Sequence, residues 1–504
     1  RYDPLGEIAR TGELPCSPED ALAAAGGLAA ETARDWPKAR ALAVDTGIYV
    51  EAGATAGWEL GIAVATGVEY LRAAAAAGLD PAEAASQIEF TLAVGPDQFL
   101  EMAKFRAIRR LWARVLEESG VAAEARFSPT YARTSARMIS AVDPWVNMLR
   151  VTTAAFAAGT GGADGVTVTP FDRMIGQPGD LGRRIARNTQ IILQDESSLG
   201  RIADPLAGSW YGEELTDEVA KAGWERFREI EREGGALAAL RSGLIATTLG
   251  GLADEREDDL NHRRRVMTGI NEFPLLGDDG TEPERADLSR VEGDSARLLE
   301  GPEVPGLGRL TEAAPSERLA VATSLASAGA RIDELSAAVA GETFSLPALN
   351  VRHDATPFEV MRRAARRHEE NGGDRPQIYL ACMGSIASHV NYANWAKSFF
   401  EVAGVETVPS GALESNEDQA KTLRDGGFEL VAICAGKNQS PEDVADLVGR
   451  LREAGASYIY MVNSTPELNE AATAAGADEL VRNGVNLTEV LTATLGRLGV
   501  EVKS

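Results

Sequence analysis

Cysteine and histidine are scarce in this sequence. Its 504 residues include three cysteines (Cys16, Cys382 and Cys434) and four histidines. So little cysteine excludes a disulfide scaffold and favours a reducing compartment. The longest apolar stretches, such as residues 73–78, are far shorter than the roughly 20 residues of a membrane span. No signal peptide is recognised, so we expect a cytoplasmic protein with no membrane contact.

Positive charge is also in short supply. The chain has 50 Lys and Arg against 76 Asp and Glu, which gives a net charge of −26. An acidic chain repels phosphate backbones, and this excludes nucleic acid as an expected partner. Single hydrophobic cores stop growing at roughly 250–300 residues, so we also expect more than one domain.

Residues 1–275 alternate short β-like runs with longer helical patterns, which predicts an α/β domain with a parallel sheet. One predicted helix carries an apolar stripe, Phe105, Ile108, Trp112 and Val115, suited to lying on a sheet. A (β/α)8 barrel needs eight strands. The sequence predicts five, so three would be missing, and the N-terminal start is the natural place for the deficit. The five are at 41–47, 88–94, 123–128, 165–170 and 266–271.

Residues 276–373 are turn-rich, acidic and punctuated by Gly and Pro, which predicts a linker with helices. One helix is expected over 357–370. It carries four arginines on one side, which form either a solvated face or a contact with an acidic partner: Arg362, Arg363, Arg366 and Arg367.

Residues 374–504 give the clearest pattern. Five βα units predict a flavodoxin-like doubly wound sheet in the order 2-1-3-4-5, which binds ligands outside the carboxyl ends of its strands. The stretch "ACMGSIAS" at 381–388 lies at such an end, yet it holds no metal ligand and no phosphate-binding loop. The strands are expected at 377–383, 406–411, 428–435, 457–463 and from Glu479.

Several long stretches resemble the methylmalonyl-CoA mutase family. They include "DPWVNMLRVTTAAFAAGTGGADGVTVTPFD" at 143–172, "RRIARNTQIILQDES" at 183–197 and "DPLAGSWYGEELT" at 204–216, with further likeness at 51–73 and 103–116. The resemblance implies a (β/α)8 barrel threaded by the CoA ester and a C-terminal cobalamin-binding domain. It also implies radical chemistry that adenosylcobalamin starts and the protein shields.

The cobalamin motif of this family is not kept. Its D-x-H-x-x-G pattern aligns with "ACMGSIASHVN" at 381–391, so that Ile386 replaces the Asp, Ser388 the cobalt ligand and Asn391 the closing Gly. A supporting Lys becomes Cys382. His389 lies one residue past the ligand position, a rotation of about 100° on a helix, which argues against it as a substitute.

Two further parts of the cofactor site also differ from the family. The S-x-L segment that should line the tunnel for the nucleotide tail matches the residues from Cys434 onward. The Gly-Gly pair matches Val462-Asn463, whose side chains would occupy space that the cofactor needs.

The barrel motifs have changed as well. By the same resemblance, Ile48 replaces the catalytic His, and Gly47 replaces its neighbouring Tyr. Gln87 stands where the family's substrate-clamping Arg is expected. Tyr131 and Arg133 replace a His and a Gln. These losses predict that the chain itself has no catalytic, cofactor-binding or metal-binding residue.

The pattern of losses resembles the small (β) subunit of heterodimeric members of the family. This implies a structural subunit of an isomerase whose homologous large subunit binds adenosylcobalamin. A G-protein chaperone and an adenosyltransferase would then act on the complex. One alternative is an independent acyl-CoA mutase with an altered substrate or unusual cobalamin binding. Another is a module that senses CoA esters.

A few other residues leave alternatives open. Cys382 and Cys434 fall at the ends of two neighbouring predicted strands, with His389 nearby, and form either a thiol pair, a metal site or two buried apolar groups. The other histidines, His262, His353 and His368, show no metal-ligand spacing. The glycine-rich stretch 235–252 lacks the spacing of a phosphate-binding loop.

Overall fold

The computed structural model describes residues 1–277, 305–313, 317–339, 341–411, 413 and 415–503. The chain divides into two compact units, which we treat separately. Unit 1 comprises residues 1–138, 147–253 and 282–352, and unit 2 comprises residues 139–146, 254–281 and 353–504. The described part of the predicted linker 276–373 therefore divides between the two units. In the described residues no helix is long and apolar enough to cross a membrane.

Unit 1 contains a four-stranded parallel sheet in the order β2-β3-β4-β5. The chain start extends it by one bridge, because Tyr2 pairs in parallel with Leu42. A separate antiparallel pair joins β1 (Glu13–Leu14) to β6 (Phe344–Ser345). The strands of the larger sheet are β2 (Leu42–Asp45), β3 (Ile88–Val94), β4 (Thr130–Thr134) and β5 (Gly165–Thr167).

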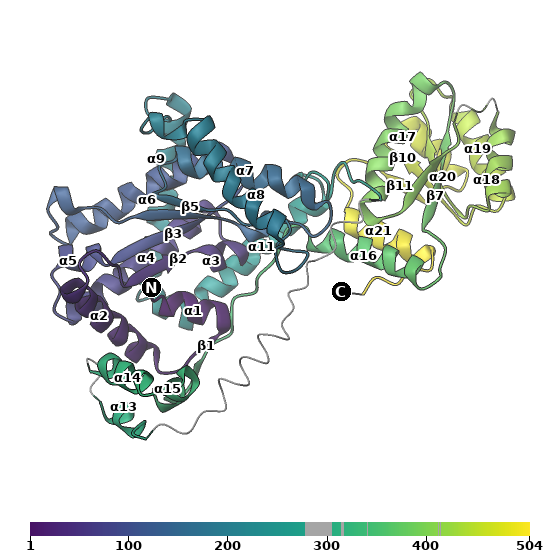
Figure 1. Cartoon of the computed structure of the whole chain (residues 1–504). Coiled ribbons are helices and arrows are strands. Elements are labelled where there is room, and N and C mark those ends of the chain that lie inside the picture. Colours follow the sequence, from purple (N-terminus) through teal and green to yellow (C-terminus); the bar gives the residue numbers. More distant parts are fainter. Residues whose placement is uncertain (278–304, 314–316, 340, 412, 414, 504) are drawn as a thin grey trace. The chain divides into compact units, whose positions relative to one another are not determined.

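Helices cover one face of this sheet (Figure 1). The predicted stripe on α6 is confirmed, since Phe105, Ile108, Trp112 and Val115 are all buried. Gly67 of α4 lets Trp112 and Phe90 pack closely against the helix, which a Cβ at position 67 would prevent. The longer helices of unit 1 are α2 (Pro18–Asp35), α4 (Ala56–Ala76), α6 (Gln98–Glu118), α7 (Pro144–Thr160), α8 (Asp180–Ile191), α9 (Trp210–Arg232) and α11 (Leu244–Asn261).

The shorter helices of unit 1 connect these elements. They are α1 (Pro4–Thr11), α3 (Gly47–Glu51), α5 (Pro81–Ser86), η1 (Ala123–Ala125), η2 (Ala136–Met138), η3 (Ile192–Glu196), η4 (Leu199–Arg201), α10 (Ala236–Arg241), α13 (Gly308–Glu312), α14 (Arg318–Ser327) and α15 (Ile332–Val339). The first residues of α7 and the last residues of α11 fall in unit 2.

Two of the five predicted strands are wrong. Residues 123–125 form a 3₁₀ turn, and the strand begins after Pro129, at Thr130. Residues 266–271 form a turn with one isolated bridge, because the Asn271 side chain bonds the Met267 N–H and the carbonyls of Leu260 and Arg265. Side-chain bonding of this kind competes with strand pairing. The sheet is open in the described residues, and a closed barrel is not found.

Unit 2 contains a five-stranded parallel sheet in the order β8-β7-β9-β10-β11. Numbered along the chain, this order is 2-1-3-4-5. All five strands lie where the sequence predicts them. The central strands β7, β9 and β10 are buried apolar runs, whereas the edge strands β8 and β11 are shorter and partly exposed. They are β7 (Gln377–Cys382), β8 (Glu406–Pro409), β9 (Leu430–Cys434), β10 (Tyr458–Val462) and β11 (Glu479–Val481).

Helices alternate with these strands and form two separate cores with the faces of the sheet. Four helices of unit 2 carry side-chain N-caps, from Ser415, Ser440, Thr465 and Asn486. The helices are α16 (Thr356–Glu370), α17 (Ile386–Phe400), η5 (Glu401–Ala403), α18 (Asn416–Gly426), α19 (Pro441–Glu453), α20 (Pro466–Ala474) and α21 (Leu487–Arg497). An α/β fold with parallel sheets is thus confirmed.

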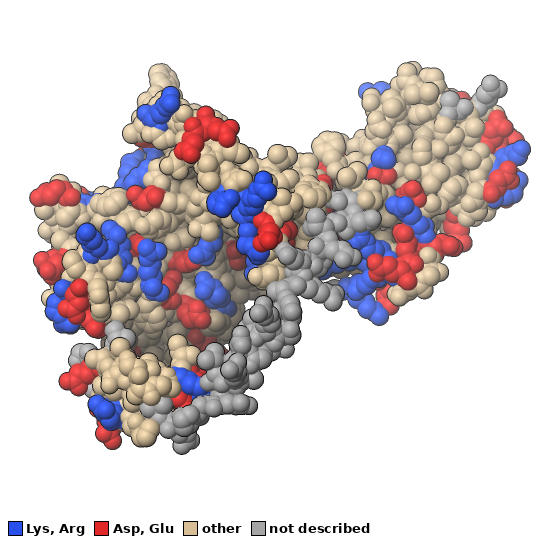
Figure 2. Space-filling view, in the orientation of Figure 1, with Lys and Arg blue, Asp and Glu red and all other residues tan. Residues whose placement is uncertain are grey.

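Surface charge is mixed on both units. On the face shown in Figure 2, basic and acidic side chains lie interspersed. In the predicted arginine helix, α16, Arg362 bonds the carbonyls of Val402, Gly269 and Ile270. This arginine is therefore structural, and it does not belong to a free basic face.

Candidate functional site

The carboxyl ends of β2, β3 and β4 border a pocket of about 270 Å³ in unit 1. Parallel α/β proteins place their binding sites at this edge of the sheet. The pocket brings together three positions that the sequence singled out, Gly47, Ile48 and Arg133. It is lined by Arg10, Asp45, Gly47, Ile48, Glu51, Ala93, Arg133, Thr134 and Ser135.

The polar groups of this pocket bond one another. Arg133 donates to a carboxylate oxygen of Asp45 at 2.8 Å, and the other oxygen of Asp45 accepts the Gly47 N–H at 3.0 Å. Ile48 is only 4% exposed and supplies an apolar wall. A buried aliphatic side chain can neither transfer a proton nor donate a hydrogen bond to a carbonyl.

The other two mapped positions of the barrel lie elsewhere. Tyr131 points from the same face of β4 as Arg133, and its ring packs under the guanidinium of Arg1 at 5.5 Å. Gln87 is buried and lies just before β3, at the amino end of the strand. The pocket is at the other end of β3, about 20 Å away for a seven-residue strand. A side chain at position 87 therefore does not reach the pocket.

A buried charge cluster lies next to this pocket, and the sequence alone does not predict it. Lys104 contacts Glu59 at 2.7 Å, Glu101 at 2.6 Å and the Ala93 carbonyl at 2.5 Å. Glu59 also accepts from Thr46 and from the Ala93 N–H. One feature of the sequence does indicate a buried charge: Glu59 is the only charged residue in the apolar stretch 56–68.

The charges in this cluster compensate one another. Burial favours the neutral amine, but Glu101 and Glu59 outweigh it and raise the pKa of Lys104. Burial raises the pKa of Glu101. The three side chains are almost fully enclosed, with Lys104 at 3% side-chain exposure. The cluster is placed to hold β3 against α4 and α6, and it has no access to a substrate.

The carboxyl edge of the second sheet carries the positions that align with the cobalamin motif. Ser388 donates to the Ser385 carbonyl at 2.6 Å, with the Met383 carbonyl at 3.2 Å. Ile386 is 62% exposed. A Cβ at Gly436 would lie 2.2 Å from the Ser388 carbonyl oxygen, so the segments that follow β7 and β9 are in direct contact.

The two cysteines of unit 2 are brought together. Cys382 and Cys434 are register partners on β7 and β9, both are buried, and both are free thiols. Donation from Cys434 lowers the pKa of the Cys382 thiol, and the same contact together with burial raises the pKa of Cys434. His389 is also buried, and its Nδ1 has no partner in the described part of the chain. The described residues contain no group of three or more His, Cys, Asp or Glu that could hold a metal ion.

Beside the thiols, unit 2 has a pocket of about 370 Å³. Its floor is a neutral chain of hydrogen bonds, in which Tyr379 donates to Gln419 and Gln419 donates to the Cys382 carbonyl, each at 2.7 Å. Burial raises the pKa of Tyr379 to about 12. The lining is Cys382, Met383, Gly384, Leu413, Ser415, Asn416, Glu417, Gln419, Gln439, Asp443, Asp446 and Arg450.

The remaining mapped positions are part of the fold itself. Val462 is buried in the same core as the two thiols. Asn463 adopts a positive φ of 41°, and its N–H donates to the Val481 carbonyl at 2.7 Å. Asn391 lies on the exposed side of α17.

These features define a class, an α/β protein of two units whose parallel sheets both carry pockets at the carboxyl ends of their strands. Comparison with known proteins then gives the family. The model of the family described as methylmalonyl-CoA mutase matches residues 1–340. The chain belongs to the methylmalonyl-CoA mutase family, and the resemblance seen in its sequence is confirmed.

Similar proteins carry the name of one subunit. The methylmalonyl-CoA mutase small subunit of Streptomyces virginiae is 40% identical over 498 residues, which are 99% of this chain and 70% of that protein. The probable small subunit of Mycobacterium tuberculosis (strain H37Rv) is 35% identical, over 91% of this chain and 65% of that protein. The small subunit of Propionibacterium freudenreichii is 30% identical, over 92% and 64%. The chain thus spans about two thirds of the length of these relatives.

Proposed function

We propose that this chain is the non-catalytic small subunit of a heterodimeric, adenosylcobalamin-dependent methylmalonyl-CoA mutase. The complex interconverts (R)-methylmalonyl-CoA and succinyl-CoA by radical rearrangement, and its active site belongs to a homologous large subunit. One observation carries the proposal. At the position of the cobalt ligand, the Ser388 hydroxyl is bound to carbonyls of its own loop.

The residues at the sheet edge of unit 2 do not fit adenosylcobalamin. A cobalt ligand needs a free nitrogen lone pair backed by a hydrogen-bond partner. Here the partner position is Ile386, a hydrocarbon, and the only nearby imidazole, His389, is buried. The contact between Gly436 and the Ser388 carbonyl leaves no gap between the two segments.

The pocket in unit 1 is equally unsuited to the substrate. A methylmalonyl thioester needs a donor at its carbonyl and a guanidinium free to bind its carboxylate. Ile48 offers no donor, and Arg133 is paired with Asp45. The residues thus support a role in assembly and stability of the complex.

The folds of the two units agree with this proposal. The 2-1-3-4-5 order of the second sheet is that of a flavodoxin-like domain, the type that binds cobalamin in this family. The four parallel strands of unit 1, with helices on one face, agree with part of a (β/α)8 barrel. Each unit is then an inherited scaffold with altered site residues.

The test is purification of the complex from the cells that make it, with an absorption spectrum for corrinoid and intact masses of all chains. We expect two chains in equal amounts and corrinoid only when the larger chain is present. A lone chain with stoichiometric corrinoid and turnover would instead establish the independent mutase and overturn the proposal.

A further inference from the structure

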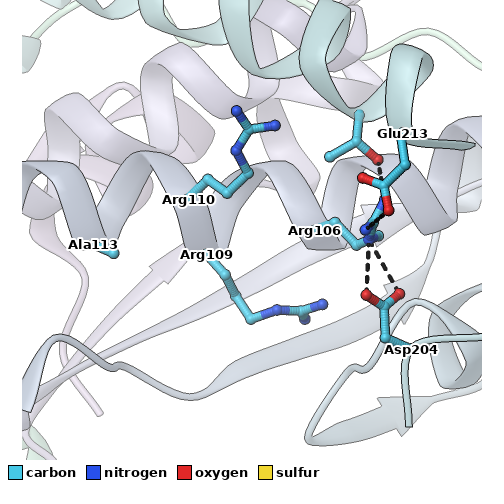
Figure 3. Close-up of a pocket in the computed structure, with 7 residues that line it drawn as sticks. Arg106, Arg109, Arg110, Ala113, Asp204 and Glu213 are labelled. Carbon is cyan, nitrogen blue, oxygen red and sulfur yellow. Dashed lines mark hydrogen bonds and ion pairs between the residues drawn. The ribbon is translucent and has the colours of Figure 1, made fainter. Parts of the chain in front are cut away.

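The arginine pocket of unit 1 has no role in the proposed function. It is a depression of about 590 Å³ between α6 and the start of α9, away from the strand ends (Figure 3). We use this name for the cavity lined by Arg106, Arg109, Arg110, Ala113, Asp204, Glu213 and Thr216.

Arg106 holds the two acidic residues of the pocket. Its guanidinium contacts Asp204 at 3.1 Å and Glu213 at 2.8 Å, and it also donates to the Thr216 hydroxyl at 2.8 Å. In Figure 3 the dashed lines join Arg106 to these carboxylates, whereas no such line reaches Arg109 or Arg110. Arg106 therefore offsets one of these two negative charges, and with Arg109 and Arg110 the lining keeps an excess of one positive charge.

Arg109 is held in position by backbone carbonyls. Its guanidinium donates to the carbonyls of Gly161 at 2.8 Å and Gly162 at 3.1 Å. None of the carboxylates in the described chain forms an ion pair with it. An arginine has five N–H donors, so three remain for a ligand. Burial lowers the pKa of Arg109, and the charges of Asp204 and Asp164 offset this effect only in part.

Arg110 adds a second guanidinium that can move. Its side chain is 54% exposed, and its ion pair with Asp217 is long, at 3.2 Å. Asp217 also pairs with Lys221 at 2.6 Å and so does not depend on Arg110 for a partner. Arg110 can therefore leave Asp217 and bind an anion in the pocket at little cost in free energy.

We infer that the arginine pocket binds the phosphate group of a small molecule, held by Arg109 and Arg110. The spare donors of two guanidinium groups exceed what the two oxygens of a carboxylate can accept, and they match the three oxygens and double charge of a phosphate monoester. A volume of about 590 Å³ is within the range of small-molecule sites and leaves space for the organic part of the ligand.

Isothermal titration calorimetry of the full chain with inorganic pyrophosphate, and separately with inorganic phosphate, tests this site at low salt. We expect binding of pyrophosphate that weakens as salt is added. Arg109→Gln should raise the Kd about tenfold or more, because charge-assisted hydrogen bonds are lost. Arg114→Gln is the control, since Arg114 is on the same helix, is as exposed as Arg110 and pairs with Glu117 and Glu118 outside the pocket.

Two results would overturn the inference. One is the absence of binding at millimolar pyrophosphate. The other is an equal Kd for Arg109→Gln and Arg114→Gln. If Arg109→Gln fails to fold, the Kd of Arg110→Glu is measured in its place, because the Arg110 side chain is more than half exposed and its replacement should not prevent folding. A large loss of affinity then supports the site, and an unchanged Kd overturns it.

Discussion

The interiors of the two units are stabilised by different kinds of interaction. Unit 1 encloses the charged Lys104 cluster and also holds Asp3, a partly buried carboxyl group that accepts hydrogen bonds from Tyr70, Gly6 and Asp45. The sheet of unit 2 is covered by apolar side chains, with a neutral contact between Tyr379 and Gln419. Its buried carboxylates, Glu359 and Glu401, pair with cations that are themselves exposed, Arg363 and Lys397. Removing the partner of a buried ion costs more unfolding free energy than removing the partner of a buried neutral group. Unit 1 should therefore be the more sensitive to mutation and to pH.

The largest effect is expected for Lys104→Met. The substitution keeps the volume of the side chain but leaves Glu59 and Glu101 enclosed without a cation. Breaking such a buried pair costs about 3–5 kcal/mol, to be measured as the free energy of unfolding in urea. Lys221→Met is the control, because Lys221 is exposed and pairs only at the surface. A loss for Lys104→Met as small as that of the control would remove the distinction between the units.

The second effect concerns pH. Burial raises the pKa of Asp3 above its ordinary value. The folded state then binds this proton at a higher pH than the unfolded state. The contribution of Asp3 to stability is fully present below the unfolded pKa and is lost as pH rises through the folded pKa. Wild-type protein should therefore gain stability relative to Asp3→Asn when the pH falls from 7 to 4, as measured by urea midpoints.

Asp35→Asn should change the pH dependence of stability in the opposite direction. Arg34 lowers the pKa of Asp35, so this contribution is present above the unfolded pKa and is lost as pH falls through the folded pKa. Because Asp35 is exposed, the change should be small. If Asp3→Asn and Asp35→Asn shift the pH profile in the same direction, the buried charge at position 3 does not act as described.

The same difference explains how much of each unit could be predicted. In unit 2 the three central strands, β7, β9 and β10, are buried on both faces, and their continuous apolar runs marked the sheet. In unit 1 one face of the sheet carries Glu89, Tyr131 and Arg133, and these polar residues hid β4. The sequence could not show that Asn271 bonds backbone groups of a turn, nor that Lys104 meets Glu59, 45 positions earlier.

The candidate site was predictable in part. The resemblance identified Gly47, Ile48 and Arg133, which do lie at one pocket. The predicted strand at 88–94 is confirmed as β3, and it places Gln87 at the end of the strand opposite to the pocket. The contact between Cys382 and Cys434 follows from the strand order, whereas the ion pair of Arg133 with Asp45 needed three-dimensional structure.

An intermediate effect is expected in unit 2 for Tyr379→Phe. The change removes the hydroxyl that donates to Gln419 and leaves a buried amide oxygen without its donor. This should cost about 1 kcal/mol of unfolding free energy, and less than Lys104→Met, because no net charge is left buried. Tyr458→Phe, at a half-buried hydroxyl bonded to Glu479, is the matched control and should cost less. A cost for Tyr379→Phe equal to that of Lys104→Met would contradict the comparison.

The smallest effect is expected for Arg133→Met in the pocket of unit 1. Its ion pair with Asp45 is short, at 2.8 Å, but the arginine side chain is 50% exposed. Pairs of this kind contribute about 0.2–1 kcal/mol and weaken with added salt. Arg114→Met, at an arginine of similar exposure, should have an effect of the same size. Unfolding in urea at low and high salt measures both. A loss of several kcal/mol at Arg133 that is independent of salt would mean that the pocket is closed to solvent, and the charged interior of unit 1 would then extend to the strand ends.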